Sequence, residues 1–74
     1  MDRFEPELTY SKTFAFSTDV DASRFVIALE TTRRAWNGEK VTVFVLGAKV
    51  EQIEKLATIH KAQAVGDWAD KASG

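Results

Sequence analysis

Apolar and polar residues alternate along the chain from Leu8 to Ser17. One side of this alternation is made up of Leu8, Tyr10, Phe14 and Phe16. A period of two with many aromatic and β-branched residues is typical of a strand with one buried face. Lys12 interrupts the apolar side, so the strand pattern is clearest over residues 13–17.

The next segment changes to a helical period. Residues that share one predicted helix face follow at steps of three and four: Ala22, Phe25, Val26, Leu29, Thr32 and Trp36. Thr18 and Asp21 have the spacing of a capping box, and Asn37-Gly38 is typical of a helix stop. The pattern predicts a helix over residues 22–37.

A run of β-branched, aromatic and aliphatic residues, VTVFVL, occupies positions 41–46. A nearly continuous apolar run of this kind indicates a strand buried on both faces, as in parallel sheets. A second helix is predicted over residues 50–64, with one face formed by Val50, Ile53, Leu56, Ala57, His60 and Ala64. Residues 65–74 contain too few apolar residues to predict another strand.

The resulting order of strand, helix, strand and helix predicts an α/β fold. We expect a small βαβα unit with parallel strands, a Rossmann-like half-domain. Because two strands make a small sheet with an unpaired edge, we expect a partner chain to complete it, or the chain to belong to a longer protein. The predicted organisation is a flexible lead-in over 1–8, a single domain over 9–65 and a flexible tail over 66–74.

Composition narrows the classes of function. The 74 residues suffice for one domain, and a net charge of −1 argues against electrostatic binding of nucleic acid. The absence of cysteine excludes disulfides and thiolate metal sites. No apolar run approaches the ~20 residues that span a bilayer, and the N-terminal residues lack the apolar region of a signal peptide. We therefore expect a cytoplasmic protein without membrane or nucleic-acid partners.

The sequence from Thr13 to about Leu56 resembles the front half of the DsrE/DsrF-like family of sulfur-relay proteins. The similarity is carried by TFAFS at 13–17, DVDA at 19–22 and above all GEKVTVFVLGAKV at 38–50. Active members of that family carry a persulfide-bearing cysteine beyond the second helix, which this chain lacks. The resemblance therefore implies a shortened, DsrE-like member without the sulfur chemistry, and the family's trimers and hexamers imply assembly into an oligomer.

Two polar segments are candidates for ligand binding, at the carboxyl ends of the predicted strands. Ser17, Thr18 and Asp19 follow the first strand, and Lys49 follows the second. In open parallel sheets such positions bind small molecules or anions. Capping of the first helix and a plain strand-to-helix turn explain the same residues without a ligand.

No catalytic constellation is evident. His60, the only histidine, falls on the apolar face of the second predicted helix without an identifiable acid–base or metal-binding companion. We therefore expect a non-catalytic binding or assembly subunit with no cofactor and no metal, acting through a homo-oligomer or a protein partner. The candidate interface residues are Trp36, Ile53, Leu56, Ile59 and Trp68, or the sheet edge beside residues 41–46. The alternative is a small-ligand or anion-binding, possibly enzymatic, domain that uses the strand ends.

Overall fold

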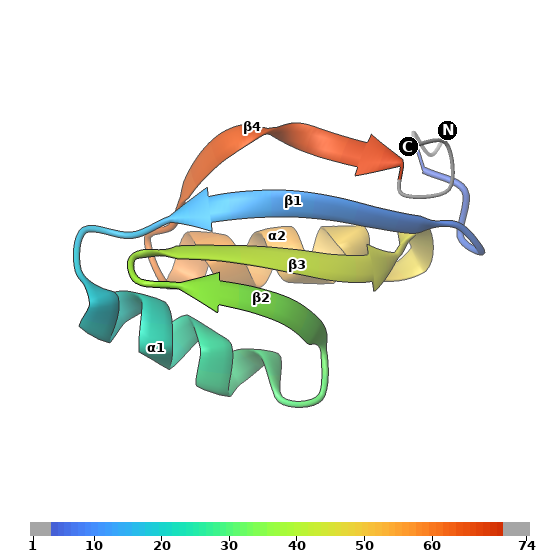
Figure 1. The fold of residues 1–74 in the computed structure, drawn as a ribbon. Coiled ribbons are helices and arrows are strands. Elements are labelled where there is room, and N and C mark those ends of the chain that lie inside the picture. The colour runs from blue at the N-terminus through green and yellow to red at the C-terminus, as the bar shows by residue number, and fades with distance from the viewer. Residues whose placement is uncertain (1–3, 71–74) are drawn as a thin grey trace.

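The fold was obtained as a computed structural model, which describes residues 4–70 (Figure 1). The elements are, in chain order, β1 (Thr9–Ala15), α1 (Asp19–Leu29), β2 (Arg33–Asn37), β3 (Lys40–Leu46), a 3-10 turn (Gly47–Lys49), α2 (Val50–Ile59) and β4 (Gln63–Asp70). Residues 1–3 and 71–74, parts of the predicted lead-in and tail, lie outside the described residues.

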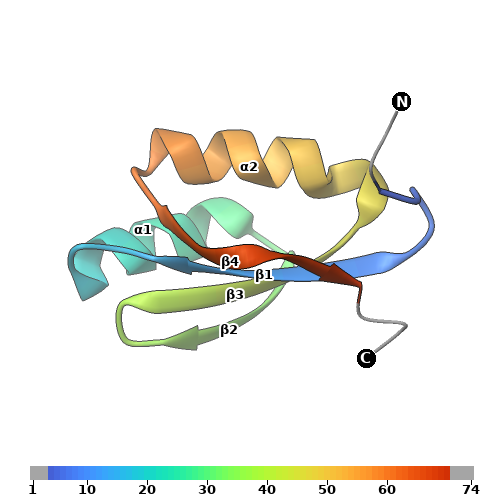
Figure 2. The same cartoon turned by 90° about the horizontal axis from the view of Figure 1, so that it is seen from above.

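The strands form one antiparallel sheet in the order β2-β3-β1-β4. Both helices lie on the same side of this sheet, and its other side is not covered by any described element (Figure 2). This is the split βαβ, or ferredoxin-like, topology of a small α+β fold. The predicted Rossmann-like βαβα unit with parallel strands is therefore wrong.

The parallel arrangement was predicted because the segment of β2 was assigned to the first helix, whose spacing of apolar residues continues through it. α1 ends at Leu29, and Glu30 follows with a positive φ of 54° that a continuing helix does not allow. Asn37 pairs with Lys40, so Gly38 and Glu39 form the turn of a β-hairpin. Gly38 has a φ of 62°, at the position where a type II′ turn places glycine. The Asn37-Gly38 pair thus belongs to a hairpin turn and not to a helix stop.

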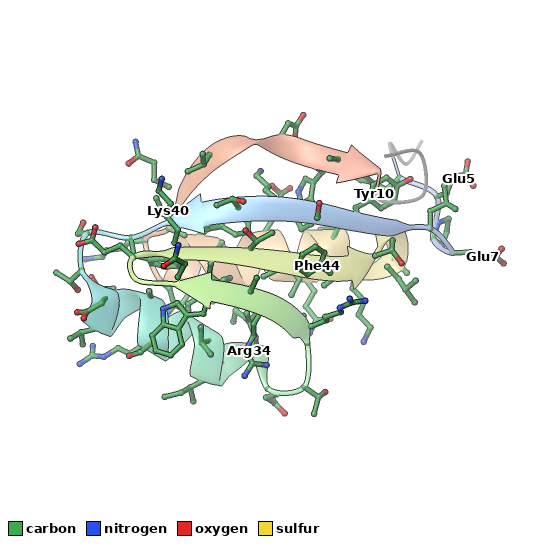
Figure 3. All side chains as sticks on the ribbon, in the orientation of Figure 1. Glu5, Glu7, Tyr10, Arg34, Lys40 and Phe44 are labelled. Carbon is green, nitrogen blue, oxygen red and sulfur yellow. The ribbon has the colours of Figure 1, made fainter. Side chains whose placement is uncertain are left out.

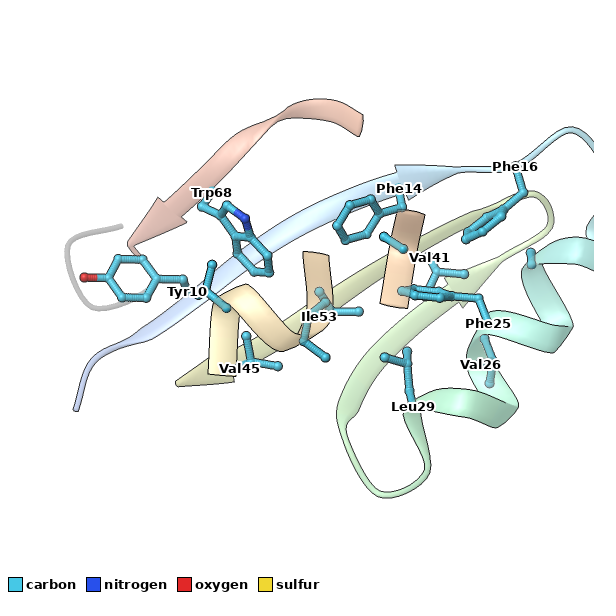
Figure 4. Close-up of a cluster of buried hydrophobic side chains, with 14 residues drawn as sticks. Tyr10, Phe14, Phe16, Phe25, Val26, Leu29, Val41, Val45, Ile53 and Trp68 are labelled. Carbon is cyan, nitrogen blue, oxygen red and sulfur yellow. The ribbon is translucent and has the colours of Figure 1, made fainter. Parts of the chain in front are cut away.

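The alternation predicted for the first strand is confirmed. Tyr10, Phe14 and Phe16 point toward the helices and are buried, whereas their neighbours in β1 are only partly covered. Lys12 also lies on the buried side. In the core, Phe14 and Phe16 pack against Phe25 of α1 with ring centroids 5.7 Å and 5.1 Å away (Figure 4).

β3 is buried on one face only. Val41, Val43 and Val45 face the helices, and the residues between them face the uncovered side. Since β3 pairs with β1 along its whole length and with β2 over residues 40–44, most of the segment 41–46 has no free edge for a partner chain to complete. The expected sheet completion at this strand is therefore also wrong.

β4 occupies the segment predicted as the end of a helix and a tail. α2 ends at Ile59, and Lys61 with a φ of 60° turns the chain back toward the sheet. Val65 pairs with Thr13 and Ala69 with Ser11, so the β4 residues between them bulge opposite Lys12. Trp68 emerges from this bulge into the core, near Phe14 and Phe4.

The residues before β1 close one end of the core. The Gly47 amide donates to the Leu8 carbonyl at 2.8 Å, and the Tyr10 hydroxyl accepts from the Glu5 amide at 2.9 Å (Figure 3). A Cβ on Gly47 would clash with the Glu5 carbonyl, so glycine permits this close approach. The turn that leads into α2 is thereby fixed against the N-terminal segment.

Candidate functional site

The two predicted ligand-binding segments lie at opposite ends of the sheet. Because β1 and β3 are antiparallel, Ala15 pairs with Lys40 at the start of β3, while Leu46 at its end pairs with Thr9. Ser17, Thr18 and Asp19 therefore lie at one end and Lys49 at the other. The structure does not bring these residues into a single site.

Thr18 acts as the cap of α1. Its Oγ1 accepts from the Asp21 amide at 3.2 Å, which is the capping interaction that the sequence predicts. Ser17 and Asp19 are exposed beside it, and neither lines any of the hollows described below. The helix-cap explanation thus accounts for this segment.

Lys49, in contrast, lines a cleft between the end of α1 and the start of α2. The cleft has two adjoining lobes of about 260 Å³ and about 200 Å³. Residues common to both lobes are Thr31, Thr32, Lys49, Gln52 and Ile53. Arg33 and Phe44 line only the larger lobe, whereas Glu30 lines only the smaller one. We call this feature the α1–α2 cleft.

One wall of the α1–α2 cleft is fixed by Arg34. Its guanidinium donates to the carbonyls of Glu30 and Thr32, both at 3.0 Å, so it holds the connection between α1 and β2 (Figure 3). The neighbouring Arg33 guanidinium lies over the Phe44 ring, 5.5 Å from its centroid. Sequence reasoning missed Arg33 and Arg34 as site residues because it placed them in a helix.

The uncovered side of the sheet is a second candidate surface, which we call the open face. Cross-strand neighbours point to the same side of a sheet, so the register gives its composition. One central row is Arg33, Phe44, Ser11 and Ala69. The next row is Ala35, Thr42, Thr13 and Val65. The Thr13 and Thr42 hydroxyls are hydrogen-bonded to each other at 2.7 Å.

The predicted interface residues are spread over different parts of the molecule. Ile53 is buried and Leu56 packs against the core, so the chain's own fold covers much of both side chains. Ile59 on α2 is 71% exposed, and Trp36 on β2 is 51% exposed. Trp68 is buried in the core (Figure 4). No single surface contains all five residues.

His60 lies at the end of α2 beside a shallow polar hollow of about 230 Å³. The hollow is lined by Asp21, Arg24, Ile59, His60 and Lys61. The imidazole packs edge-on to the Phe25 ring, with centroids 5.9 Å apart. Within residues 4–70 no cluster of three or more histidine or acidic side chains could hold a metal ion.

Comparisons with protein-family models, with curated proteins and with solved structures found no match for the chain. The DsrE/DsrF-like resemblance stays a prediction, although the parallel sheet that it implied is replaced by an antiparallel one. Neither α1 nor α2, the helices of the described region, is long and apolar enough to cross a membrane.

Proposed function

We propose that the chain is a non-catalytic association subunit that pairs with a second copy of itself through the open face. The observation that carries this proposal is the uncharged centre of that face. Its central positions on β1, β3 and β4 are Ser11, Thr13, Thr42, Phe44, Val65 and Ala69. Charged residues are depleted from the centres of protein interfaces, so this composition suits a contact surface.

The charges of the open face lie at its rim. Arg33 stands on the edge strand β2, and Lys40 lies at the end of β3. In a pair related by a two-fold axis, the same patch faces itself, and a charge at the centre would meet its own copy. A neutral centre with rim charges avoids this repulsion. The net charge of −1 adds little long-range repulsion between copies.

The shape of the open face also suits a second sheet. Its central side chains are mostly small, and two sheets pack face to face at a spacing of about 10 Å. With four strands and the seven-residue length of β1, the face measures about 19 Å by about 23 Å. A projected area of about 440 Å² is small beside the roughly 800 Å² that each partner buries in a standard interface. We therefore expect a weak dimer that forms in the micromolar range.

Sedimentation velocity of the full chain over a range of concentrations tests the proposal. The wild type should shift from monomer to dimer as its concentration rises through about 100 μM, typical of a small interface. Ser11→Lys places a charge at the centre of the open face and should leave a monomer throughout. The matched control Thr58→Lys adds the same charge on the exposed side of α2 and should dimerise like the wild type.

Circular dichroism checks that both variants keep the fold. A wild type that stays monomeric at millimolar concentration would rule out the pairing. If the wild type and Ser11→Lys dimerise equally strongly, the interface does not lie on the open face. Ile59 would then be the next residue to replace.

A further inference from the structure

We propose that the outer edge of β2 binds an extended acidic segment of a partner protein, which adds a further strand to the sheet. β2 is the edge strand beyond β3, and all of its residues are exposed. No other described strand pairs with its outer side (Figure 1). This inference concerns an edge of the sheet and does not depend on self-association through the open face.

The register of the β2–β3 hairpin shows which backbone groups of β2 point outward. In an antiparallel pair, successive residues alternate between bonding to the neighbouring strand and pointing away from it. The pair that closes the two-residue turn, Asn37 with Lys40, is hydrogen-bonded, and every second residue of β2 before it bonds to β3 in the same way. The amides and carbonyls of Arg34 and Trp36 therefore point to the outer edge, where an extended chain can pair with them.

Two adjacent arginines of β2 determine the charge of a suitable partner. Neighbouring side chains in a strand point to opposite faces, so Arg33 lies on the open face, over the Phe44 ring, and Arg34 lies on the helix side. The ion pairs within residues 4–70 involve only lysines as cations, so neither arginine has a carboxylate partner in the described region. Two successive acidic residues on an added strand would each face one arginine.

The Arg34 guanidinium is held in place and keeps donors for a carboxylate. Its hydrogen bonds to the carbonyls of Glu30 and Thr32 both come from Nη1. The N–H groups of Nε and Nη2 form a parallel pair of donors, the arrangement that binds a carboxylate through two hydrogen bonds. Because the two carbonyls already restrict the side chain, less freedom is lost when a partner binds.

The helix side of the edge also carries exposed apolar surface. Trp36 is 51% exposed, and its Nε1 donates to the Gly38 carbonyl at 2.8 Å, which holds the indole against the hairpin turn. α1 lies beside this edge of the sheet (Figure 1). Asp21 and Ala28 of α1 line hollows together with residues of α2, so the opposite flank of α1, with the exposed Ile27, faces the β2 side. A suitable partner therefore combines its acidic pair with an apolar residue opposite Trp36.

A peptide with these features tests the proposal by titration into the ¹⁵N-labelled full chain. In antiparallel pairing, the acetylated peptide Thr-Val-Thr-Glu-Glu-Thr places its valine opposite Trp36 and its two glutamates opposite Arg34 and Arg33. The amides of Arg34 and Trp36 should shift most, because each gains a hydrogen-bond partner. The titration is made below the concentration at which the proposed dimer forms, so that the two associations are measured separately.

The contributions of charge and of backbone pairing are tested separately. Arg33→Gln and Arg34→Gln should each weaken binding of the peptide about tenfold, the effect of losing one charge-assisted hydrogen bond. The control Arg24→Gln removes an equal charge from the flank of α1 that faces α2 and should change the affinity less than twofold. A peptide that is N-methylated at its valine keeps every side chain but lacks the amide that would donate to the Trp36 carbonyl. This peptide should bind about tenfold more weakly or not at all.

The proposal can fail in several distinguishable ways. No shifts at millimolar peptide would rule out the site. Equal affinities for the peptide and its N-methylated form would show attraction of charges without strand addition. An affinity unchanged in both Arg33→Gln and Arg34→Gln would show that acidic residues are not recognised. Concentration-dependent shifts of the Arg34 and Trp36 amides without peptide would show that a second copy of the chain occupies this edge in place of an acidic partner.

Discussion

The Nζ of Lys12 lies 3.0 Å from Oε2 of Glu54, and this ion pair links the central strand β1 to α2. The Lys12 side chain is only 8% exposed, whereas that of Glu54 is 47% exposed. The ammonium also lies near the rings of Phe14 and Trp68, 5.4 Å and 5.7 Å from their centroids. A charged residue thus occupies a position on the apolar face of the strand because the fold supplies it with a carboxylate and two aromatic rings.

The asymmetry of this pair predicts unequal effects of removing its members. Glu54→Ala leaves a buried ammonium without its carboxylate and should lower the free energy of unfolding by about 1–3 kcal/mol. Lys12→Met keeps the apolar contacts and leaves a carboxylate that water can reach, so the loss should stay below about 1 kcal/mol. Urea unfolding followed by tryptophan fluorescence measures both. Equal losses would contradict the assignment of the burial cost to Lys12.

Gly47→Ala should destabilise the protein by about 1–3 kcal/mol, the cost of a forced shift in a packed region. The added methyl group would push the Glu5 carbonyl away and strain the hydrogen bond between Gly47 and Leu8. Ala48→Ser is the comparison: Ala48 lies next to Gly47 in the same turn and is exposed, so the added hydroxyl group meets water. Thermal unfolding should show a clear drop in Tm for Gly47→Ala alone.

Thr18→Ala removes the oxygen that accepts from the Asp21 amide. The expected loss in the free energy of unfolding is about 1 kcal/mol, as for other helix caps. Thr18→Ser keeps the acceptor and should behave like the wild type. A loss as large in Thr18→Ser as in Thr18→Ala, measured by urea unfolding, would show that the methyl group matters and the cap does not.

Trp68→Phe should cost less than about 1 kcal/mol despite the smaller ring. The indole Nε1 is buried and has no hydrogen-bond partner among the described residues. Removing an unpaired buried donor recovers about 1–3 kcal/mol of desolvation cost, which offsets the lost apolar contact. Trp68→Ala lacks this compensation and should cost about 3–5 kcal/mol. Thermal unfolding followed by circular dichroism compares the two, and equal losses would exclude the offset.

The sequence was sufficient for the elements that are defined by local patterns. The alternation over Leu8–Phe16 predicted the buried side of β1. The capping signal of Thr18 identified the residue that caps α1, although the helix was predicted from residue 22 and begins at Asp19. The apolar run over 41–46 predicted β3. In each case the buried residues and the local backbone signals are neighbours in the chain.

The remaining elements, β2 and β4, and the α1–α2 cleft depend on contacts between residues that are distant in the chain. Thr32 and Trp36 continue the helical spacing, yet the hydrogen bonds of Arg34 and the hairpin at Gly38 place this segment in the sheet. β4 has an irregular pattern because its bulge faces Lys12, and its pairing with β1 spans some fifty residues of chain. The α1–α2 cleft combines β2, β3 and α2 and could not be anticipated once β2 was assigned to a helix.

The bulge in β4 also makes this edge of the sheet a poor template for further strands. A flat edge strand offers its free backbone groups as a template for further strands, whereas a bulged strand does not. At the opposite edge of the sheet, β2 begins with Arg33 and Arg34, whose charges hinder the approach of a like strand. We therefore expect copies that pair through the open face, as proposed, to stop at two, because both edges of the sheet disfavour the addition of further strands from other copies.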